Sequence, residues 1–402
     1  MRAVVFTLGC KVNEAESASI MAALEQMGWE TDDKLSYADA YVLNTCAVTR
    51  EAERKSRQLI SRAKKFNPNA QIFVCGCASE KDRESFIKRG VTFVTGAKRK
   101  QDVIDAFASC FDTRSTTLPY PKQTRTRAFI KIQDGCNNFC SYCIIPYLRG
   151  REVSRPVEDI LREINCTDSP EIVLNGINIS SFSGGLESLI AALKGVDKRI
   201  RLGSLECSAV TDSLLAALKE LKDFAPQFHL SLQSGSDAVL KAMNRHYTRK
   251  EYLEKCAKIY RYFPDAAITT DIIAGFATET EEDFSDSLSI IEEAGFARIH
   301  AFAYSPREGT VAYRMKDVPA DIKSDRLHRL LKAGKISEEK YIFRFLGSTR
   351  KIIAEEVEDG YTSGYTDNYI RVYIKGILTA GKIYRVKLIE AFKDGVLAVN
   401  EG

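Results

Sequence analysis

The sequence is poor in histidine and has no long apolar run. It contains 4 histidines among 402 residues, and they are too scattered to indicate a zinc site with mixed histidine and cysteine ligands. No apolar stretch approaches the roughly 20 residues that span a bilayer. The apolar stretch after Met1 is too short for a signal peptide and lacks a small-residue cleavage site. These absences predict a cytoplasmic protein that does not enter a membrane.

The sequence also lacks a strong excess of charge of either sign. It has 58 basic and 54 acidic residues and a net charge of +4, which is too small to indicate a nucleic-acid partner by itself. Basic residues are concentrated in the ranges 50–65, 122–155 and 323–335. Each run can equally be the solvated face of a helix, so an RNA-binding surface and an ordinary surface both stay open.

Short apolar runs alternate with amphipathic segments along the first quarter of the chain. The runs Ala3–Leu8, Ala40–Asn44 and Gln71–Cys75 are separated by helical patterns. Strands that alternate with helices indicate a parallel sheet covered on both faces. We therefore expect an α/β protein in which residues 1–112 form a doubly wound parallel sheet.

Two further regions follow, and their patterns differ. Residues 122–336 continue the alternation of strand and helix, which predicts a partial or full β/α barrel with its chemistry at the carboxyl ends of the strands. Residues 340–402 change to period two with glycine-containing turns, which predicts a small antiparallel β-barrel. The expected strands of the central region are 172–174, 200–202, 228–232, 267–273 and 298–302.

Eleven cysteines stand out in a chain expected in a reducing compartment, where thiols are more often ligands or catalytic groups than disulfides. Cys10, Cys46 and Cys77 each follow one of the three expected N-terminal strands. Because the carboxyl ends of parallel strands form the ligand crevice of such a sheet, we expect these cysteines to converge. Cys75, at the end of its strand, is the alternative to Cys77.

Cys136, Cys140 and Cys143 form a compact triplet with three and then two intervening residues. A [4Fe–4S] cluster takes four thiolates, so a triplet without a fourth cysteine nearby leaves one iron open. An open position is what a catalytic metal site requires. Three incidental buried cysteines are the alternative, but free cysteines seldom cluster so tightly, and zinc would require a fourth ligand.

These motifs resemble those of the radical S-adenosylmethionine (SAM) methylthiotransferases. The triplet, with Tyr142 before its last cysteine, is similar to the radical SAM signature. The segments 9–13, 44–48 and 76–78 resemble the N-terminal domain of the family. Three further segments resemble the branch of the family that acts on threonylcarbamoyladenosine in tRNA: Asn175–Asn178, Leu230–Ser236 and Ser305–Thr310. The tail corresponds to the RNA-binding TRAM domain of the family.

The resemblance implies two [4Fe–4S] clusters and a SAM pocket. Cys136, Cys140 and Cys143 would hold the cluster that cleaves SAM. Cys10, Cys46 and Cys77 would hold an auxiliary cluster, with Cys77 preferred because it follows a glycine as in the family's Gly-Cys pattern. The remaining Cys110, Cys166, Cys207 and Cys256 are expected to be small buried residues. Candidates for the SAM pocket, with ordinary barrel packing as the alternative, are Tyr142, Gly176, Asn178, Glu206, Gln233 and Ser234.

The resemblance also implies a reaction with two SAM molecules. One would methylate a sulphur on the auxiliary cluster, and the other would yield a 5′-deoxyadenosyl radical that removes hydrogen from carbon-2 of adenosine 37. The product would be 2-methylthio-N6-threonylcarbamoyladenosine in the anticodon stem-loop of tRNA, with flavodoxin or ferredoxin as a low-potential electron donor. The alternatives are the branches acting on isopentenyladenosine or on a ribosomal-protein aspartate, and a non-catalytic iron–sulphur electron carrier with an RNA-binding tail.

Overall fold

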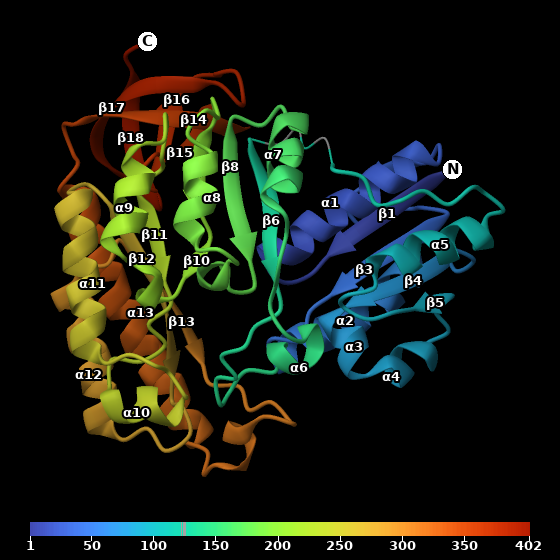
Figure 1. The fold of residues 1–402 in the computed structure, drawn as a ribbon, viewed down its shortest axis with the longest axis horizontal. Helices are drawn as coiled ribbons and strands as arrows, with labels where there is room; N and C mark the ends of the chain where they lie inside the picture. Colours follow the sequence, from blue (N-terminus) through green and yellow to red (C-terminus); the bar gives the residue numbers. More distant parts are fainter. Residues whose placement is uncertain (122, 124–125) are drawn as a thin grey trace.

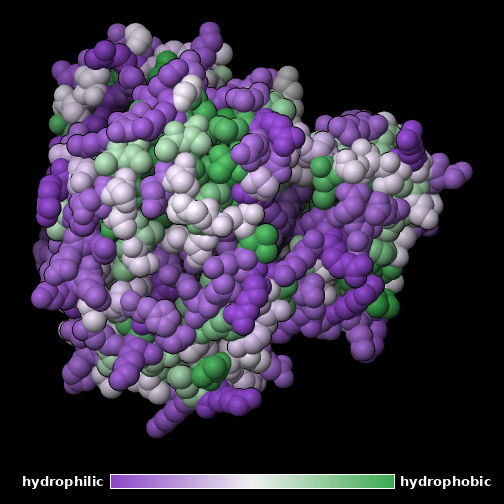
Figure 2. All heavy atoms as spheres, in the orientation of Figure 1, coloured by the Kyte–Doolittle hydropathy of each residue, from purple (hydrophilic) through white to green (hydrophobic). Residues whose placement is uncertain are grey.

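Three bodies, each built on its own strands, make up the structure (Figure 1), a computed structural model that describes residues 1–121, 123 and 126–402. The N-terminal lobe projects from one side of a larger central body, and a small barrel closes one end of that body. Across the described residues, no helix combines the length and the apolar character needed to cross a membrane. The face shown in Figure 2 is mostly hydrophilic, and a notch separates the N-terminal lobe from the rest.

The N-terminal lobe is a five-stranded parallel sheet of strand order β2-β1-β3-β4-β5. Apolar side chains of α1 and α5 pack on one face, and those of α2, α3 and α4 pack on the other. This confirms the predicted doubly wound sheet. Its elements are β1 (Arg2–Thr7), α1 (Lys11–Gln26), β2 (Glu30–Asp32), β3 (Ala40–Thr45), α2 (Arg50–Phe66), β4 (Gln71–Gly76), α3 (Cys77–Lys81), α4 (Arg83–Ile87), β5 (Phe93–Val94) and α5 (Lys100–Cys110).

The central body is a partial β/α barrel made of two four-stranded sheets, β7-β6-β8-β9 and β10-β11-β12-β13. All neighbours are parallel except β6 and β7. The strands are β6 (Arg127–Asp134), β7 (Val153–Ser154), β8 (Glu171–Gly176), β9 (Arg199–Leu202), β10 (Ser204–Leu205), β11 (Gln227–Leu230), β12 (Ala267–Ala274) and β13 (Arg298–Ala303). The helices are α6 (Ile145–Arg149), α7 (Val157–Cys166), α8 (Leu186–Ala192), α9 (Asp212–Lys219), α10 (Asp237–Ala242), α11 (Arg249–Tyr262), α12 (Glu281–Ala294) and α13 (Ala320–Phe343).

The inner face of this barrel is polar, which differs from the branched apolar filling of an ordinary β/α barrel. Alternate strand residues such as Ile130, Ile172 and Ile299 face the surrounding helices and form the main core. Because successive side chains of a strand point to opposite faces, the residues between them line the lumen. They include Arg127, Glu171, Arg201, His229, Asp271 and His300.

The C-terminal segment closes into a five-stranded barrel of order β14-β15-β16-β18-β17. Its neighbours are antiparallel, as predicted, except that β16 and β18 run parallel. The strands are β14 (Thr349–Glu358), β15 (Tyr361–Thr366), β16 (Arg371–Lys375), β17 (Ile383–Phe392) and β18 (Gly395–Asn400).

The small barrel covers the amino ends of the central strands (Figure 1). Ala267 and Ala297, at the starts of β12 and β13, share a core with Val372 of β16 and Leu388 of β17. Arg127, which begins β6, forms an ion pair with Glu355 of β14. The carboxyl ends of the central strands therefore stay free for the site. The predicted boundary between residues 336 and 340 falls inside α13, which continues to Phe343 and packs against both bodies.

Candidate metal centre

The loop that carries the cysteine triplet follows β6 and is folded tightly. Gly135 has a φ of 72°, and a Cβ at this position would collide with the carbonyl group of Arg151. The amide of Cys136 donates a hydrogen bond to the carbonyl of Gly150 (3.1 Å), and the amide of Ser141 donates to that of Met243 (3.0 Å). These bonds fix the loop at the carboxyl end of the barrel.

The three thiols of this loop affect one another, and one of them accepts a hydrogen bond from an arginine. Burial, with the neighbouring thiols of Cys140 and Cys136, raises the pKa of Cys143 to about 12. Nη1 of Arg245 donates to Sγ of Cys140 (3.3 Å) and also lies 2.9 Å from Oε1 of Glu206. Glu206 in turn accepts a hydrogen bond from Nδ2 of Asn138 in the same loop (2.7 Å).

Cys10, Cys46 and Cys77 meet at the carboxyl ends of β1, β3 and β4, which are neighbours in the N-terminal sheet. A Cβ on Gly9 would lie 2.9 Å from Cβ of Cys46. Only glycine at this position therefore lets the backbone next to Cys10 approach Cys46 so closely. Burial, with contributions from the thiols of Cys77 and Cys10, raises the pKa of Cys46 to about 11. The arrangement is the one that strand placement predicts.

Cys75 points away from this group. Its side chain is fully buried in the core formed by β4 with α1 and α5, whereas Cys77 belongs to the core on the other face of the sheet. The groups that act on Cys75 electrostatically are Lys100, Glu16 and Arg149. The placement of Cys75 and Cys77 on opposite faces of the sheet favours Cys77 as the third member of the set.

Arg149 lies at the interface between the lobes, close in sequence to one cysteine triplet and in contact with the other. It ends α6, six residues after Cys143, yet its fully buried side chain places Nε 3.4 Å from Sγ of Cys77. Its Nη1 donates to Oε1 of Glu16 (2.9 Å) and to Asp134 (3.1 Å), and its Nη2 donates to Oδ1 of Asn13 (2.7 Å). One side chain therefore contacts Cys77 of one triplet and Asp134, which precedes the loop of the other.

The surroundings of Arg149 carry more positive than negative charge. Lys131 lies 2.8 Å from Glu16, and Lys100 lies 3.4 Å from it. Burial opposes ionisation of Glu16, but Lys100, Lys131 and Arg149 outweigh it and hold its pKa well below the usual range. Three cations thus face two carboxylates, Glu16 and Asp134, beside three thiols. The surplus suits thiolates, which are anionic.

Both donor sets fit iron–sulphur clusters. Each offers three thiols and an arginine N–H directed at sulphur, and hydrogen bonds to sulphur are among the features that set the reduction potential of such clusters. Over the described ranges, no three His, Cys, Asp or Glu side chains converge closely enough to hold a single ion. A cluster places each thiolate on a different iron, so its ligands need not converge on one point.

Of the six candidates for the SAM pocket, Tyr142 and Glu206 contact the cysteine-loop region directly. Tyr142 is part of the loop, and its ring lies 6.4 Å from that of Phe276 after β12. Glu206 contacts Asn138 and Arg245, as described above. The end of β8 is tied to the same region, because the amide of Asn178 donates to Oε1 of Gln133 (2.8 Å), just before the loop. Oδ1 of Asn178 is buried and has no hydrogen-bond partner among the described residues.

The other three candidates shape the strand ends. A Cβ on Gly176 would lie 2.9 Å from the carbonyl oxygen of Gln133. Gln233 has a φ of 71° and bridges β12 through Asp271 and Ile273. Ser234 is fully buried, with its hydroxyl 3.3 Å from that of Ser287 on α12. Ser234 is therefore placed behind the loop, away from the cysteines.

Sequence patterns do not indicate Arg149 or Arg245, because their partners lie far away along the chain. Lys11 and Asn175 belong to the motif segments 9–13 and 175–178, but the sequence does not predict that they contact each other. Nδ2 of Asn175 donates to the carbonyl of Lys11 (3.1 Å) and so ties the start of α1 to the barrel. The expectation for the unassigned cysteines is wrong in two cases: Cys110 and Cys166 are exposed, since each ends a surface helix, while Cys207 and Cys256 are buried.

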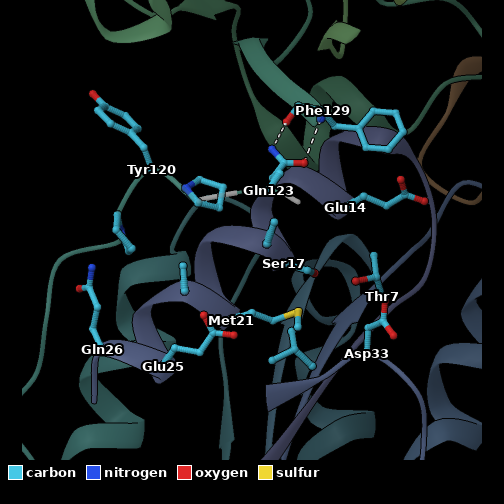
Figure 3. A pocket seen from close by; sticks show the side chains of 15 residues that line it. Thr7, Glu14, Ser17, Met21, Glu25, Gln26, Asp33, Tyr120, Gln123 and Phe129 are labelled. Carbon is cyan, nitrogen blue, oxygen red and sulfur yellow. Dashed lines mark hydrogen bonds between the residues drawn. The ribbon is translucent and has the colours of Figure 1, made fainter. Parts of the chain in front are cut away.

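A cavity of about 710 Å³ lies between α1, β1 and the segment that enters the barrel (Figure 3). Glu14, Ser17 and Met21 of α1 line it, together with Tyr120 and with Phe129 of β6. No cysteine of either triplet belongs to its described lining. This cavity is therefore separate from the metal centre.

The basic run at 122–155 is mostly internal. Lys122 and Arg125 lie outside the described residues. Arg127 pairs with Glu171 (2.7 Å), Lys131 with Glu16, and Arg155 with Glu163 (2.5 Å). The run at 323–335 winds from buried Lys323 and Arg326 to exposed Lys332 and Lys335. Among the three runs, α2 keeps the largest exposed basic set: Arg50, Arg54, Lys55, Arg62 and Lys65.

Comparison with known proteins gives the same assignment. Residues 2–96 match the Uncharacterized protein family UPF0004, and residues 130–291 match the Radical SAM superfamily. The chain is 37% identical to the threonylcarbamoyladenosine tRNA methylthiotransferase MtaB of Bacillus subtilis (strain 168), over 97% of this chain and 94% of that protein. It is 34% identical to the tRNA-2-methylthio-N(6)-dimethylallyladenosine synthase of Thermotoga petrophila, over 88% and 86% of the two chains.

Solved structures share the fold at low sequence identity. The radical SAM methyltransferase TsrM from Kitasatospora setae matches with a TM-score of 0.57 and 11% identity, over 76% of this chain and 73% of that chain. The cobalamin-dependent SAM radical enzyme OxsB matches with a TM-score of 0.53 and 12% identity, over 84% and 56%. The partial barrel with a cysteine loop at its carboxyl end is thus the radical SAM fold. The chain belongs to the radical SAM methylthiotransferase family, in the branch of the MtaB relatives.

Proposed function

We propose that the protein methylthiolates carbon-2 of N6-threonylcarbamoyladenosine at position 37 of tRNA, using two SAM molecules and two [4Fe–4S] clusters. The observation that carries the proposal is that each cysteine triplet lies at the carboxyl ends of the strands of its own sheet, with Arg149 contacting Cys77 of one triplet and following Cys143 of the other. The proposed domains are 1–112 for the auxiliary cluster, 122–336 for the radical SAM core and 340–402 for RNA binding.

Cys136, Cys140 and Cys143 would hold one cluster, and Cys10, Cys46 and Cys77 the other. When bound, these groups supply a 5′-deoxyadenosyl radical from SAM and the sulphur that is methylated and transferred. Arg245 and Arg149 each donate an N–H to a ligand sulphur. The buried Oδ1 of Asn178 provides an acceptor for the amino group of SAM. Tyr142, Gly176, Glu206 and Gln233 shape the rest of the pocket, and Ser234 supports it from behind.

The partners of the proposed enzyme are the anticodon stem-loop of tRNA and a low-potential flavodoxin or ferredoxin. A non-catalytic electron carrier would not require a polar, open barrel lumen beside three-cysteine sites. The isopentenyladenosine branch is a second candidate, because relatives named as dimethylallyladenosine synthases are 34% identical over most of the chain.

The test is reaction of the anaerobically reconstituted protein with two RNAs that differ at position 37. Nucleoside mass spectrometry should show a methylthio product from the threonylcarbamoyladenosine RNA and none from the isopentenyladenosine RNA. Formation of 5′-deoxyadenosine should accompany the product. Exclusive modification of the isopentenyladenosine RNA would contradict the proposed substrate, and cleavage of SAM with neither RNA modified would contradict the proposed transfer.

A further inference from the structure

Lys11 places a cation without a partner at the mouth of the barrel. Its backbone carbonyl accepts the hydrogen bond from Asn175 at the end of β8, so the start of α1 is fixed there. Across the described residues its ammonium group has no hydrogen bond and no ion pair, and its side chain remains open to solvent. Burial, followed by Arg201 and Arg127 of the lumen wall, lowers the pKa of Lys11, while Glu14 and Glu171 act in the opposite direction. The group therefore belongs to the lumen rather than to the outer surface.

Strands β12 and β13 form part of the wall of the lumen. His300 of β13 is exposed to the lumen, and its ring lies 5.8 Å from that of His229. His229 is already engaged, because its Nε2 lies 3.2 Å from Asp271 and its Nδ1 lies 3.0 Å from the hydroxyl of Thr269. Lys11 is among the groups that act on His300 electrostatically. Across the part of the chain that the structure describes, the imidazole of His300 forms no hydrogen bond or ion pair, so its ring is available in the lumen.

The carboxylates at the start of β8 and on β14 are already paired with arginines of the lumen. Glu171 is occupied by two arginines, since Arg201 contacts it at 2.7 Å and 3.1 Å and Arg127 at 2.7 Å. Nη1 of Arg201 is nevertheless buried without a partner among the described residues. A buried donor such as this Nη1 is unfavourable without a partner unless a ligand supplies an acceptor. The lumen is therefore suited to an anionic group.

An apolar surface lies beside this cationic group. Phe302 is two residues beyond His300 on the same face of β13, and 51% of its surface is exposed. Exposed aromatic rings of this kind stack on nucleic-acid bases. A base lying against Phe302 would bring its substituent toward His300 and Lys11.

We propose that the barrel lumen receives the modified base and that Lys11, with His300, binds the carboxylate of its threonyl group. This inference rests on the proposed function. The ammonium group of Lys11 supplies the charge, and the imidazole of His300 supplies an N–H donor. An apolar substituent would leave Lys11 without a partner, so the same contact selects against it. Lys11 and His300 are specificity-determining residues in this view, and the carboxylate is the feature that they read.

The test measures binding of labelled anticodon stem-loops to the cluster-loaded full chain by fluorescence anisotropy, with no turnover. One RNA carries threonylcarbamoyladenosine, and a second carries its methyl ester, which removes the charge and little else. The intact protein should bind the acid about tenfold more tightly than the ester, as expected for a hydrogen bond to a charged group. Lys11→Gln should bring the two affinities together, whereas Lys11→Arg should keep most of the difference.

Lys250→Gln is the matched control, because Lys250 is exposed on α11, outside the lumen. It should keep the tenfold preference. Iron content and circular dichroism of Lys11→Gln should equal those of the intact protein, which separates loss of recognition from loss of the neighbouring cluster or fold. A preserved preference in Lys11→Gln overturns the inference. If the intact protein modifies the acid RNA yet binds acid and ester equally, the inference is overturned and the proposed function stands. Exclusive modification of isopentenyladenosine overturns both the proposed function and the inference.

Discussion

Arg149 and Arg245 have the same relation to the two cysteine triplets. Each is buried, each directs an N–H at a cysteine sulphur, and each also pairs with a carboxylate. Arginine is suited to this position because its planar group offers several donors in fixed directions. The spacing of the cysteines in the sequence predicts where the thiols meet. It does not predict the arginines, because each reaches its sulphur from a distant part of the chain.

Cys77→Ala and Cys75→Ala test the choice between two cysteines that are two residues apart. Cys77→Ala should reduce the iron bound after reconstitution from about eight to about four per chain. It should abolish methylthiolation and leave 5′-deoxyadenosine formation detectable, because the second triplet is intact. Cys75→Ala should keep all of the iron and lose only about 1 kcal/mol of stability from core packing. Loss of iron from Cys75→Ala with full iron in Cys77→Ala would exchange their roles.

The strongly patterned elements of the sequence are found where they are predicted. Strands β1, β3, β4, β8, β9, β11, β12 and β13 and the two lobes that they build follow from apolar runs separated by helical patterns. Strands β2, β5, β6, β7, β10 and β15 are not predicted, and β2, β5, β7 and β10 have only 2 or 3 residues each. Strand β6 follows a run of prolines and charged residues, and its inward residues Arg127 and Lys131 are charged because they face a polar lumen. Strand β15 is mostly polar and has no apolar run that would predict a strand. Its pairing with β14 and β16 in the closed barrel stabilises it instead.

The turn from β4 into α3 depends on Gly76. This residue has a φ of 108°, and a Cβ would collide with the backbone of Thr45, next to Cys46. Gly76→Ala should therefore lower the free energy of unfolding by roughly 3 kcal/mol and should lose the iron held at Cys46 and Cys77. Urea unfolding and iron analysis measure the two effects.

Gly28 provides the matched control for Gly76. It also has a positive φ, 84°, but no atom lies within 4 Å of the position of a Cβ. Gly28→Ala should therefore lower the free energy of unfolding by only about 1 kcal/mol, the backbone cost of a positive φ for alanine. It should keep all of the iron. Equal effects of the two substitutions would show that the close approach at Thr45 is unimportant.

At the scale of the molecule, the small C-terminal barrel and the metal centre lie at opposite ends of the central body (Figure 1). The small barrel uses Tyr365 and Tyr369 to pack on Arg127 and Arg201 of the central strands. These tyrosines are thus occupied and do not offer a free stacking surface for RNA. Exposed basic residues of this barrel gather instead on β14 and β17 and in the turn before β17, and Lys351 lies directly across from Arg385 in the sheet.

The exposed patch formed by Lys351, Lys382, Arg385 and Lys387 should contact RNA phosphates. Replacing Lys351, Arg385 and Lys387 together with glutamine should weaken tRNA binding and reduce its salt dependence, because fewer counterions are released. Cleavage of SAM without tRNA should be unchanged. Affinities across a salt series measure the effect, with the double variant Lys332→Gln and Lys335→Gln on α13 as the control. An unchanged salt slope would assign the RNA to the exposed basic residues of α2.

The length of the central strands has a consequence for what can serve as a substrate. Strand β12 has 8 residues, and at about 3.3 Å per residue it separates the two ends of the body by roughly 26 Å. The length of the strands therefore sets the separation between the metal centre at one end and the small barrel, with its basic patch, at the other. A free nucleoside or a trinucleotide reaches one end only and loses the gain in effective concentration that a second contact provides. A folded stem-loop long enough to cover the distance keeps both contacts.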